Sequence, residues 1–273
     1  MDYSEMKHIS SRDNPVYKLV QRLAAGKREP ADGDGHAGRH VVLEGIHLCQ
    51  AWLQHVGTPQ LALFDGERLE QNAELSALAR GLEEKLCLAC EPRLMKALSQ
   101  VEHGQGVCFV VQVPAPTIPT RIDHNCIWLD RIQDPGNVGT LLRTAAAAGI
   151  RHAYLSRACA SAWSAKVLRS AQGAHFVMSI YEHVDLPRAH ERLSVPLVAT
   201  ALDNALSLYD TILPPACAWL LGNEGQGVDA ALLALADKRV FIPQVEKVES
   251  LNVAVAAGIC LFEHRRQHIR RSD

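Results

Sequence analysis

The chain has 273 residues, a length that corresponds to about two domains of ordinary size. Hydrophobic residues make up 48% and charged residues 21%, which is typical of globular proteins and excludes a disordered chain. The 28 basic and 30 acidic residues give a net charge of -2, which excludes a polybasic nucleic-acid binder of the histone type.

The sequence predicts a soluble, cytoplasmic protein. Residues 1–10 have no basic start followed by an apolar core, so no secretory signal is expected. The longest apolar stretch, residues 251–262, is too short to cross a membrane and contains Asn252 and Gly258. In the cytoplasm the eight cysteines would be reduced.

Strand-like and helix-like segments alternate along the first part of the chain. Strands are predicted at 41–45, 61–65, 85–90 and 106–113, and helices at 46–56, 72–82 and 92–100. A glycine-rich, charged stretch at 26–40 is predicted to be a flexible loop. The pattern predicts a small α/β domain over residues 1–113. A linker follows at 114–122, where the stretch PAPTIP is stiff because proline fixes φ.

Cys87, Cys90, His103 and Cys108 have the spacing C-x2-C-x12-H-x4-C, which is close to that of a zinc site. The cysteines lie in apolar strands on either side of the helix predicted at 92–100. Because the domain needs both strands for its core, the sequence favours small, buried core thiols, and no metal is expected.

The second part, residues 123–273, repeats the alternation. Strands are predicted at 126–130, 152–156, 196–202, 217–222 and 239–243, and helices at 137–150, at 165–173 and after Ser250. Apolar strands that alternate with helices are typical of a parallel sheet covered on both faces. This part is therefore predicted to be a parallel-sheet α/β domain.

The first polar loop of this domain, residues 130–139, follows its first strand. Asn137 is predicted to cap the next helix, and Gly149 to end it. Arg143 lies off the apolar face of that helix, on a side that can point toward the strand ends. Taken alone, this arginine is better explained as a solvated residue on the helix surface.

The second loop, GNEGQG at 222–227, directly follows an apolar strand. Its glycines allow a backbone to approach a ligand closely. The order is not the dinucleotide motif G-x-G-x-x-G, and no Lys-Ser or Lys-Thr follows as in a P-loop. Because ligands favour the carboxyl ends of strands in open α/β sheets, the loop indicates a binding site without identifying the ligand.

The third loop, residues 242–256, leads from a strand into the last helix, which Ser250 is predicted to cap. That helix is apolar on nearly every side and is predicted to be buried all round, within its domain or at a subunit interface. Asn252 is unusual in such a place, since a buried amide needs partners.

Together the three loops resemble the motifs of the SpoU/TrmH family of SPOUT RNA methyltransferases. The first stands here as Asn137-x-Gly139-x-x-x-Arg143, the second as LLGNEGQGVD at 220–229 and the third as IPQVEKVESLNVAVAAGICLFE at 242–263. Two further stretches are similar to the family, LDNALSLYD at 202–210 and AKVLRSAQGAHF at 165–176. A looser likeness links residues 1–113 to the family's substrate-binding domain, which has an L30e-like fold.

The resemblance implies a deep trefoil knot in the second domain, a homodimer, and S-adenosylmethionine (AdoMet) as cofactor. It implies methylation of a ribose 2′-hydroxyl in RNA, with rRNA favoured over tRNA because of the L30e-like domain. Backbone around four positions would hold the cofactor: Thr200, Gly222, Ile242 and Leu251. Five polar residues would form the catalytic site: Asn137, Arg143, Glu224, Ser250 and Asn252.

The sequence departs from the third motif at two positions. Family members often have Met where Gln244 stands and a small residue where Glu246 stands. A non-catalytic RNA-binding relative with a degraded cofactor loop is therefore one alternative. A tRNA 2′-O-methyltransferase is another, because tRNA enzymes of the family share the catalytic part. A Rossmann oxidoreductase is disfavoured because the early G-x-G-x-x-G motif with its following acid is missing.

In the implied reaction a ribose 2′-oxygen attacks the methyl group in line. Family proposals make the arginine a base, but a guanidinium stays charged at ordinary pH. We expect Arg143 to bind the substrate phosphate and stabilise the developing alkoxide, with Asn137 and Glu224 holding its guanidinium. Two basic groups could hold RNA phosphates. They are residues 264–271 and the set Lys7, Arg12, Lys18, Arg22, Lys27 and Arg28.

Overall fold

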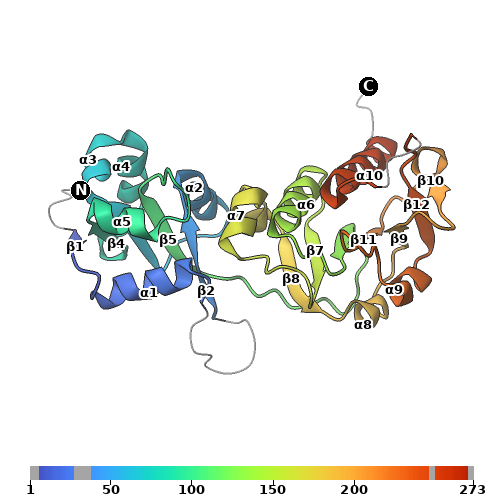
Figure 1. Cartoon of the computed structure of the whole chain (residues 1–273), viewed down its shortest axis with the longest axis horizontal. Coiled ribbons are helices and arrows are strands. Elements are labelled where there is room, and N and C mark those ends of the chain that lie inside the picture. The colour runs from blue at the N-terminus through green and yellow to red at the C-terminus, as the bar shows by residue number, and fades with distance from the viewer. Residues whose placement is uncertain (1–5, 28–37, 246–249, 270–273) are drawn as a thin grey trace. The chain divides into compact units, whose positions relative to one another are not determined.

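The computed structural model describes residues 6–27, 38–245 and 250–269. The chain forms two compact units (Figure 1). The first comprises Met1–Ala115 with Trp163–Leu168, and the second comprises Pro116–Ala162 with Arg169–Asp273. The chain thus leaves the first unit inside the proline-rich segment at 114–122.

The first unit contains a five-stranded mixed sheet with the order β1-β4-β3-β5-β2. β1, β4 and β3 run parallel, whereas β5 is antiparallel to β3 and β2. The strands are β1 (Lys7–Ile9), β2 (His40–Glu44), β3 (Leu61–Asp65), β4 (Cys87–Cys90) and β5 (Val107–Gln112). The helices are α1 (Pro15–Ala24), α2 (Ile46–His55), α3 (Gly66–Gln71), α4 (Ala73–Arg80), α5 (Pro92–Leu98) and the 3-10 helix η2 (Glu84–Leu86).

The thiols of the zinc-like spacing belong to the core of this unit. Cys87 and Cys90 lie on β4 and Cys108 on β5, and all three are buried. Burial raises the pKa of Cys87 and of Cys90 to about 11, so these side chains remain neutral thiols. His103 is exposed. Among the described residues, no group of three or more His, Cys, Asp or Glu is arranged to hold a metal ion. No helix in that part of the chain is long and apolar enough to cross a membrane.

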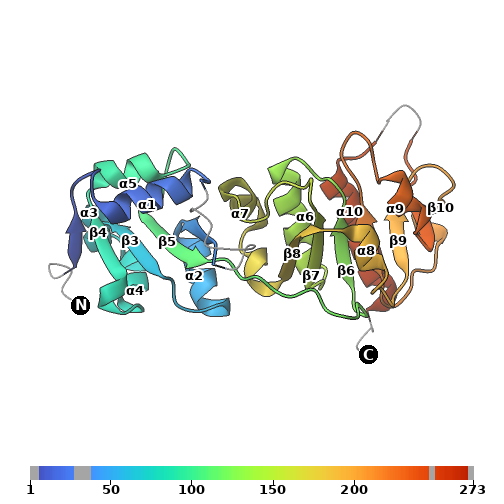
Figure 2. The same cartoon turned by 90° about the horizontal axis from the view of Figure 1, so that it is seen from below.

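The second unit contains a seven-stranded sheet with the order β10-β12-β9-β11-β6-β7-β8 (Figure 2). Every pairing in it is parallel, which confirms the predicted parallel sheet. The strands are β6 (Cys126–Leu129), β7 (His152–Ser156), β8 (Ser179–Val184), β9 (Leu197–Thr200), β10 (Leu206–Ser207), β11 (Ala218–Leu221) and β12 (Lys238–Phe241). The helices are α6 (Pro135–Ala147), α8 (Leu186–His190), α9 (Ala230–Ala234), α10 (Val253–His268), η3 (Ala174–Val177) and η4 (Leu208–Asp210). Helix α7 (Ala165–Ala171) is divided between the two units after Leu168.

Helices cover both faces of this sheet. Figure 1 shows α6 and α10 along one side and α8 and α9 along the other. The rings of Trp128 on β6 and Trp219 on β11 are fully buried. Trp219 donates its indole N–H to Nδ1 of His264 at 3.2 Å, which ties α10 to the centre of the sheet.

The prediction that the last helix is buried all round is wrong for the single chain. Ala257 and Leu261 of α10 are buried, but Val255 and Phe262 are 52% and 48% exposed. The exposed pair is spaced seven residues apart, which is about two turns, so both side chains lie on one face. α10 therefore carries an apolar stripe that its own unit leaves uncovered.

A buried histidine in this unit makes stability depend on pH. His175 is 2% exposed, and its Nε2 lies 2.6 Å from the carbonyl oxygen of Ala162. Burial lowers the pKa of His175 to about 4, although the contact with Ala162 and the charge of Glu182 favour protonation. The unfolded chain binds this proton near pH 6.5, so stability should fall as the pH drops from about 6.5 toward 4.

We expect this histidine to remove about 3 kcal/mol from the free energy of unfolding across that window. Urea unfolding of the wild type and His175→Gln at pH 7 and pH 4.5 measures the effect. The variant should lose less stability on acidification, whereas an equal loss in the two proteins would exclude His175 as the cause.

Candidate active site

Two loops leave the sheet side by side at its carboxyl edge. β6 pairs in parallel with β11, with Leu129 opposite Leu221, and the N–H of Asp130 donates to the carbonyl of Leu221 at 2.9 Å. Residues 130–134 lead from β6 into α6, and residues 222–229 follow β11. The chain runs outward from β6 to β7 and β8 and then returns to β9 beyond β11, so the strand order reverses here. Such a reversal is where open α/β sheets bind ligands.

α6 begins earlier than predicted. Asp134, not Asn137, is its N-cap, and its carboxylate accepts the N–H of Asn137 at 2.9 Å. Pro135 occupies the first helical position, which suits proline because that N–H has no helical partner. Asn137 therefore lies in the first turn, where its side chain is free to serve another purpose. The predicted stop is confirmed, since Gly149 follows the C-cap in a left-handed conformation with φ of 93°.

The 222–229 loop folds back on itself. Asn223 and Gly227 exchange two backbone hydrogen bonds, and the Asn223 side chain accepts the N–H groups of Gly225 and Gln226 at 3.0 Å. A Cβ at Gly222 would lie 2.1 Å from the backbone nitrogen of Val228. Gly222 is thus required because the loop's own backbone passes against it.

Glu224 joins this loop to the start of α6. Its carboxylate accepts the N–H groups of Gln133 and Asp134 at 3.3 and 3.2 Å and the side-chain amide of Asn137 at 3.0 Å. Partial burial raises the pKa of Glu224, but the hydrogen bonds from Asn137 and from backbone N–H groups outweigh burial and lower it. The carboxylate is therefore ionised at neutral pH.

Asn252 brings the third motif to the same place. It is the N-cap of α10, accepting the N–H groups of Ala254 and Val255, so the predicted cap at Ser250 is wrong. Its amide nitrogen also donates to the side-chain oxygen of Asn137 at 3.0 Å. These contacts form a relay, Asn252–Asn137–Glu224, that links all three motifs. Ser250 is exposed.

Arg143 lies outside the relay. It is exposed on α6, six residues after Asn137, a spacing that turns the helix by about 240° beyond a full turn. Within the described part of the chain, no hydrogen bond or ion pair joins Arg143 to Asn137 or Glu224. The hydrogen bonds by which Asn137 and Glu224 were expected to hold the guanidinium of Arg143 are therefore not present in the protein alone.

Three of the four residues expected at the cofactor lie at neighbouring strand ends, and the fourth, Leu251, directly precedes the N-cap of α10. Thr200 ends β9, Gly222 follows β11 and Ile242 follows β12, and β9 lies between β11 and β12. Ile242 and Leu251 are half-buried apolar side chains, and Thr200 donates its hydroxyl to the carbonyl of Leu220 at 3.4 Å. Apolar side chains combined with a few polar backbone groups are the usual lining of a small-molecule site. Gln244 is exposed, and Glu246 lies outside the described residues.

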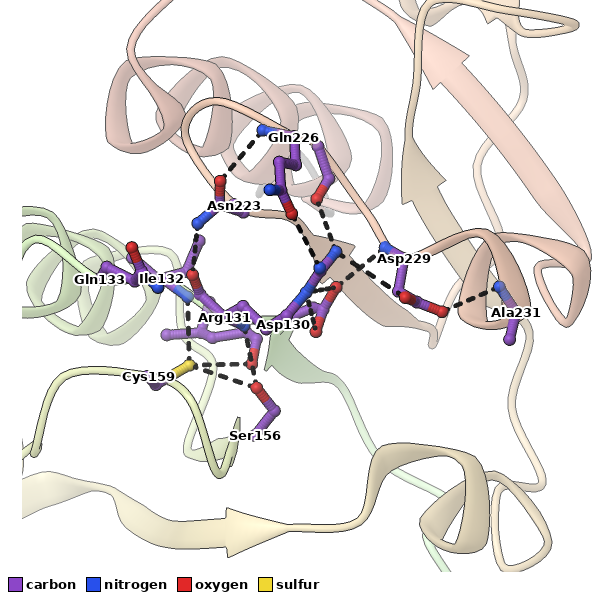
Figure 3. Close-up of polar contacts among 12 residues, drawn as sticks. Asp130, Arg131, Ile132, Gln133, Ser156, Cys159, Asn223, Gln226, Asp229 and Ala231 are labelled. Carbon is purple, nitrogen blue, oxygen red and sulfur yellow. Dashed lines mark hydrogen bonds and ion pairs between the residues drawn. The ribbon is translucent and has the colours of Figure 1, made fainter.

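Sequence reasoning missed Asp130 and Arg131, which connect the two loops (Figure 3). Asp130 is only 3% exposed, and its carboxylate accepts from Nε of Arg131 and from the N–H of Asp229. The guanidinium of Arg131 reaches Gln226 and Gly227 in the second loop. An acid and an arginine placed directly after a buried strand could have drawn attention to this pair.

Comparison with known proteins gives relatives along nearly the whole chain. The 23S rRNA (guanosine(2553)-2′-O)-methyltransferase RlmP of Bacillus subtilis is 32% identical over 95% of this chain and 100% of its own length. The 23S rRNA (uridine(2479)-2′-O)-methyltransferase of Streptomyces viridochromogenes is 31% identical over 96% of this chain and 93% of its own length.

A solved structure agrees with these relatives. The SpoU methyltransferase AviRb from Streptomyces viridochromogenes, in complex with the cofactor AdoMet, superimposes with a TM-score of 0.77. It is 27% identical, and the match covers 93% of this chain and 98% of that one. The model of the SpoU rRNA Methylase family matches residues 124–262, which include all three motif loops. This chain therefore belongs to the SpoU rRNA methylase family.

Proposed function

We propose that the protein is an AdoMet-dependent RNA 2′-O-ribose methyltransferase that acts on rRNA. The observation that carries the proposal is the Asn252–Asn137–Glu224 relay, which joins the three family motifs at the reversal of strand order. The names of the relatives support an rRNA substrate, and a tRNA substrate is the alternative. The two relatives act on different bases, a guanosine and a uridine.

AdoMet, when bound, supplies an electrophilic methyl group on a sulfonium ion. We place it at the ends of β9, β11 and β12, where Thr200, Gly222, Ile242 and Leu251 would hold it. The half-buried Ile242 and Leu251 suit its apolar parts, and the nearby strand ends offer backbone groups.

Arg143 is proposed to act on the RNA. Its exposed guanidinium is free to bind a phosphate through two parallel hydrogen bonds and to stabilise negative charge on the 2′-oxygen as that oxygen bonds to the methyl group, the methyl–sulfonium bond breaks and the hydroxyl proton passes to solvent water. A guanidinium is a poor base because it keeps its proton at ordinary pH. The contact with RNA would then replace the grip of Asn137 and Glu224 that sequence reasoning expected.

Glu224 is proposed to position rather than to accept the substrate proton. Its pKa is lowered and its oxygens already accept three hydrogen bonds, so it is a weak base with little free acceptor capacity. Asn137 and Asn252 are held by the same contacts. We propose that all three hold the loops at the carboxyl edge of the sheet in a fixed shape. Ser250 is exposed and is proposed to lie at the outer margin of the site.

The remaining family features are also proposals. Residues 1–113 would be the L30e-like RNA-binding domain, joined by the 114–122 linker to a knotted catalytic domain at 123–273. A homodimer is supported by the uncovered stripe of Val255 and Phe262 on α10, which are 52% and 48% exposed, and by Ile269 directly after the helix, which is 52% exposed. A cytoplasmic location is proposed because the bacterial relatives from Bacillus subtilis and Streptomyces viridochromogenes are named for methylation of 23S rRNA.

If the basic segments hold RNA phosphates, the RNA-binding constant should depend on salt concentration. In the C-terminal segment, Arg266 forms an ion pair with Glu263 at 2.7 Å, and Arg265 donates to the carbonyl of Ala148 at 3.4 Å. Arg270 and Arg271, like Arg28 of the N-terminal set, lie outside the described residues.

Alanine at the four arginines (Arg265, Arg266, Arg270 and Arg271) should flatten the slope of log K against log salt for RNA binding. Loss of each phosphate contact should lower the slope by about 0.7 to 0.9. Because Arg266 is already paired, we expect a decrease smaller than four such contacts would give. An unchanged slope would remove this segment from the RNA interface.

Transfer of a labelled methyl group from AdoMet tests the proposal directly. Wild-type protein should label rRNA, and substrate with a 2′-deoxyribose at the target should remain unlabelled. Labelling of tRNA alone would favour the alternative substrate. Calorimetry that finds no AdoMet binding, together with intact RNA binding, would favour the non-catalytic relative.

A further inference from the structure

We propose that Arg131 is a positioning residue that fixes the 222–229 loop against the start of α6 and so holds Glu224 on Asn137. The inference deepens the proposed methyltransferase function and rests on it. The residue concerned lies immediately after β6, where the first motif loop begins.

The guanidinium of Arg131 reaches three parts of the site at once (Figure 3). Nε lies 3.3 and 3.2 Å from the two carboxylate oxygens of Asp130, and Nη1 donates to the side-chain oxygen of Gln226 at 3.1 Å. Nη2 donates to the carbonyl of Gly227 at 3.5 Å and lies 4.0 Å from the carboxylate of Asp229. A planar fork with fixed donor directions can make these contacts together, which a lysine ammonium cannot do.

Asp130 holds the guanidinium in place. Its side chain is 4% exposed, while that of Arg131 is 29% exposed, so the ion pair is sheltered from solvent. The same carboxylate accepts the N–H of Asp229 at 2.9 Å. A buried carboxylate needs such partners, and its pairing leaves the rest of the arginine fork available for the loop.

The backbone of Arg131 contributes a second tie. Its carbonyl accepts the side-chain amide of Asn223 at 2.8 Å, and its N–H donates to the hydroxyl of Ser156 at 2.9 Å. Residues near both ends of the loop, Asn223 and Asp229, are thus attached to the Asp130–Arg131 pair. Glu224 lies between these attachments, so the position of its carboxylate depends on them.

The conformation of Arg131 indicates that its side chain is needed. Its φ is 55°, in the left-handed region where glycine has no steric penalty and a side chain costs free energy. Such strain persists where the surrounding structure over-determines it, and it clusters at functional sites. Glycine here would relieve the backbone but would also remove the guanidinium that clamps the loop and leave the buried Asp130 without its arginine partner, so positioning is measured on folded protein.

Arg131→Gly and Arg131→Lys test the inference, with Gln172→Gly as the matched control. Gln172 is also left-handed, with φ of 49°, and among the described residues its side chain donates only to the carbonyl of Arg169. Three quantities are measured: thermal unfolding, backbone hydrogen exchange at residues 223–228 without AdoMet, and the single-turnover methyl-transfer rate at saturating AdoMet. Guanidinium ion is then added to Arg131→Gly at concentrations below those that unfold it.

We expect Arg131→Gly to unfold earlier than wild type, because the buried Asp130 carboxylate loses its arginine partner. At a temperature where the variant is fully folded, it should exchange its loop amides faster and transfer the methyl group about 10- to 100-fold more slowly. Arg131→Lys should be intermediate, added guanidinium should restore part of the rate, and Gln172→Gly should match wild type in exchange and rate. Wild-type exchange and rate in Arg131→Gly would overturn the inference. If wild type itself transfers no methyl group, the proposed function fails, while loop exchange still decides whether Arg131 is the clamp.

Discussion

Replacing Arg143 by alanine is expected to lower the rate constant for methyl transfer by on the order of 10²-fold. The arginine is exposed, and among the described residues no hydrogen bond or ion pair joins it to the Asn252–Asn137–Glu224 relay, so we expect the substitution to remove a donor for the RNA without disturbing the loops. Single-turnover kinetics with excess enzyme isolates this step from product release.

The free energy of unfolding should change by less than about 0.5 kcal/mol, as for other exposed positions. Arg143→Lys should recover part of the rate because it retains the charge but not the fork. Arg188→Ala, at an exposed position on α8, is the control for losing a surface arginine. A folded Arg143→Ala protein with a wild-type rate would contradict both the stabilising role and a role as base.

Gly222→Ala should abolish measurable AdoMet binding and destabilise the second unit. The added Cβ would lie 2.1 Å from the nitrogen of Val228 and 2.2 Å from the carbonyl carbon of Gly227, which are backbone atoms that no rotamer change can move. The loop must therefore shift, which breaks the paired hydrogen bonds between Asn223 and Gly227. Overpacking of this kind costs about 1 to 3 kcal/mol of stability.

Gly225→Ala is the matched variant in the same loop. A Cβ there would have its nearest contact at 3.7 Å, with the side-chain oxygen of Asn223, and the residue does not have a positive φ. Its free energy of unfolding should stay within about 0.5 kcal/mol of wild type. Urea unfolding and calorimetry compare the two variants. Equal stability and AdoMet affinity in Gly222→Ala and wild type would show that the close approach at Gly222 is unimportant.

Local patterns in the sequence were sufficient for most elements. The strands predicted at 61–65 and 152–156 coincide with β3 and β7, because short apolar runs flanked by polar residues are distinctive. β8 was missed, since Glu182 and His183 interrupt its apolar pattern and the pairing with β7 shifts register there. β1 and β10 have only three and two residues, too few to give a periodic signal.

The caps failed for a different reason. Asp134, Asn137, Ser250 and Asn252 are all residue types that cap helices, so composition alone does not choose among them. The choice at α6 is made by Pro135, which fits the first turn, and at α10 by the contact between Asn252 and Asn137. That contact joins residues 115 positions apart and leaves no local pattern.

The candidate site also contains residues that local patterns predict and residues that only the fold brings together. Its motif residues were predicted from the family resemblance, but the clamp at Asp130 and Arg131 depends on β6 lying beside β11. The pairing of β6 with β11 follows from the strand order of the sheet, which a sequence of alternating apolar segments does not specify. The pairing of Arg131 with Gln226 and Gly227 therefore emerged only from the fold.

Mapping of 2′-O-methylation across all rRNA and tRNA from a deletion strain tests the central claim most directly. The account predicts that an rRNA nucleotide loses its 2′-O-methyl group in the deletion. Wild-type protein should restore that group, and Arg143→Ala should not restore it to the wild-type level. An unchanged rRNA methylation pattern in the deletion strain would contradict the assignment of this protein as an rRNA 2′-O-methyltransferase.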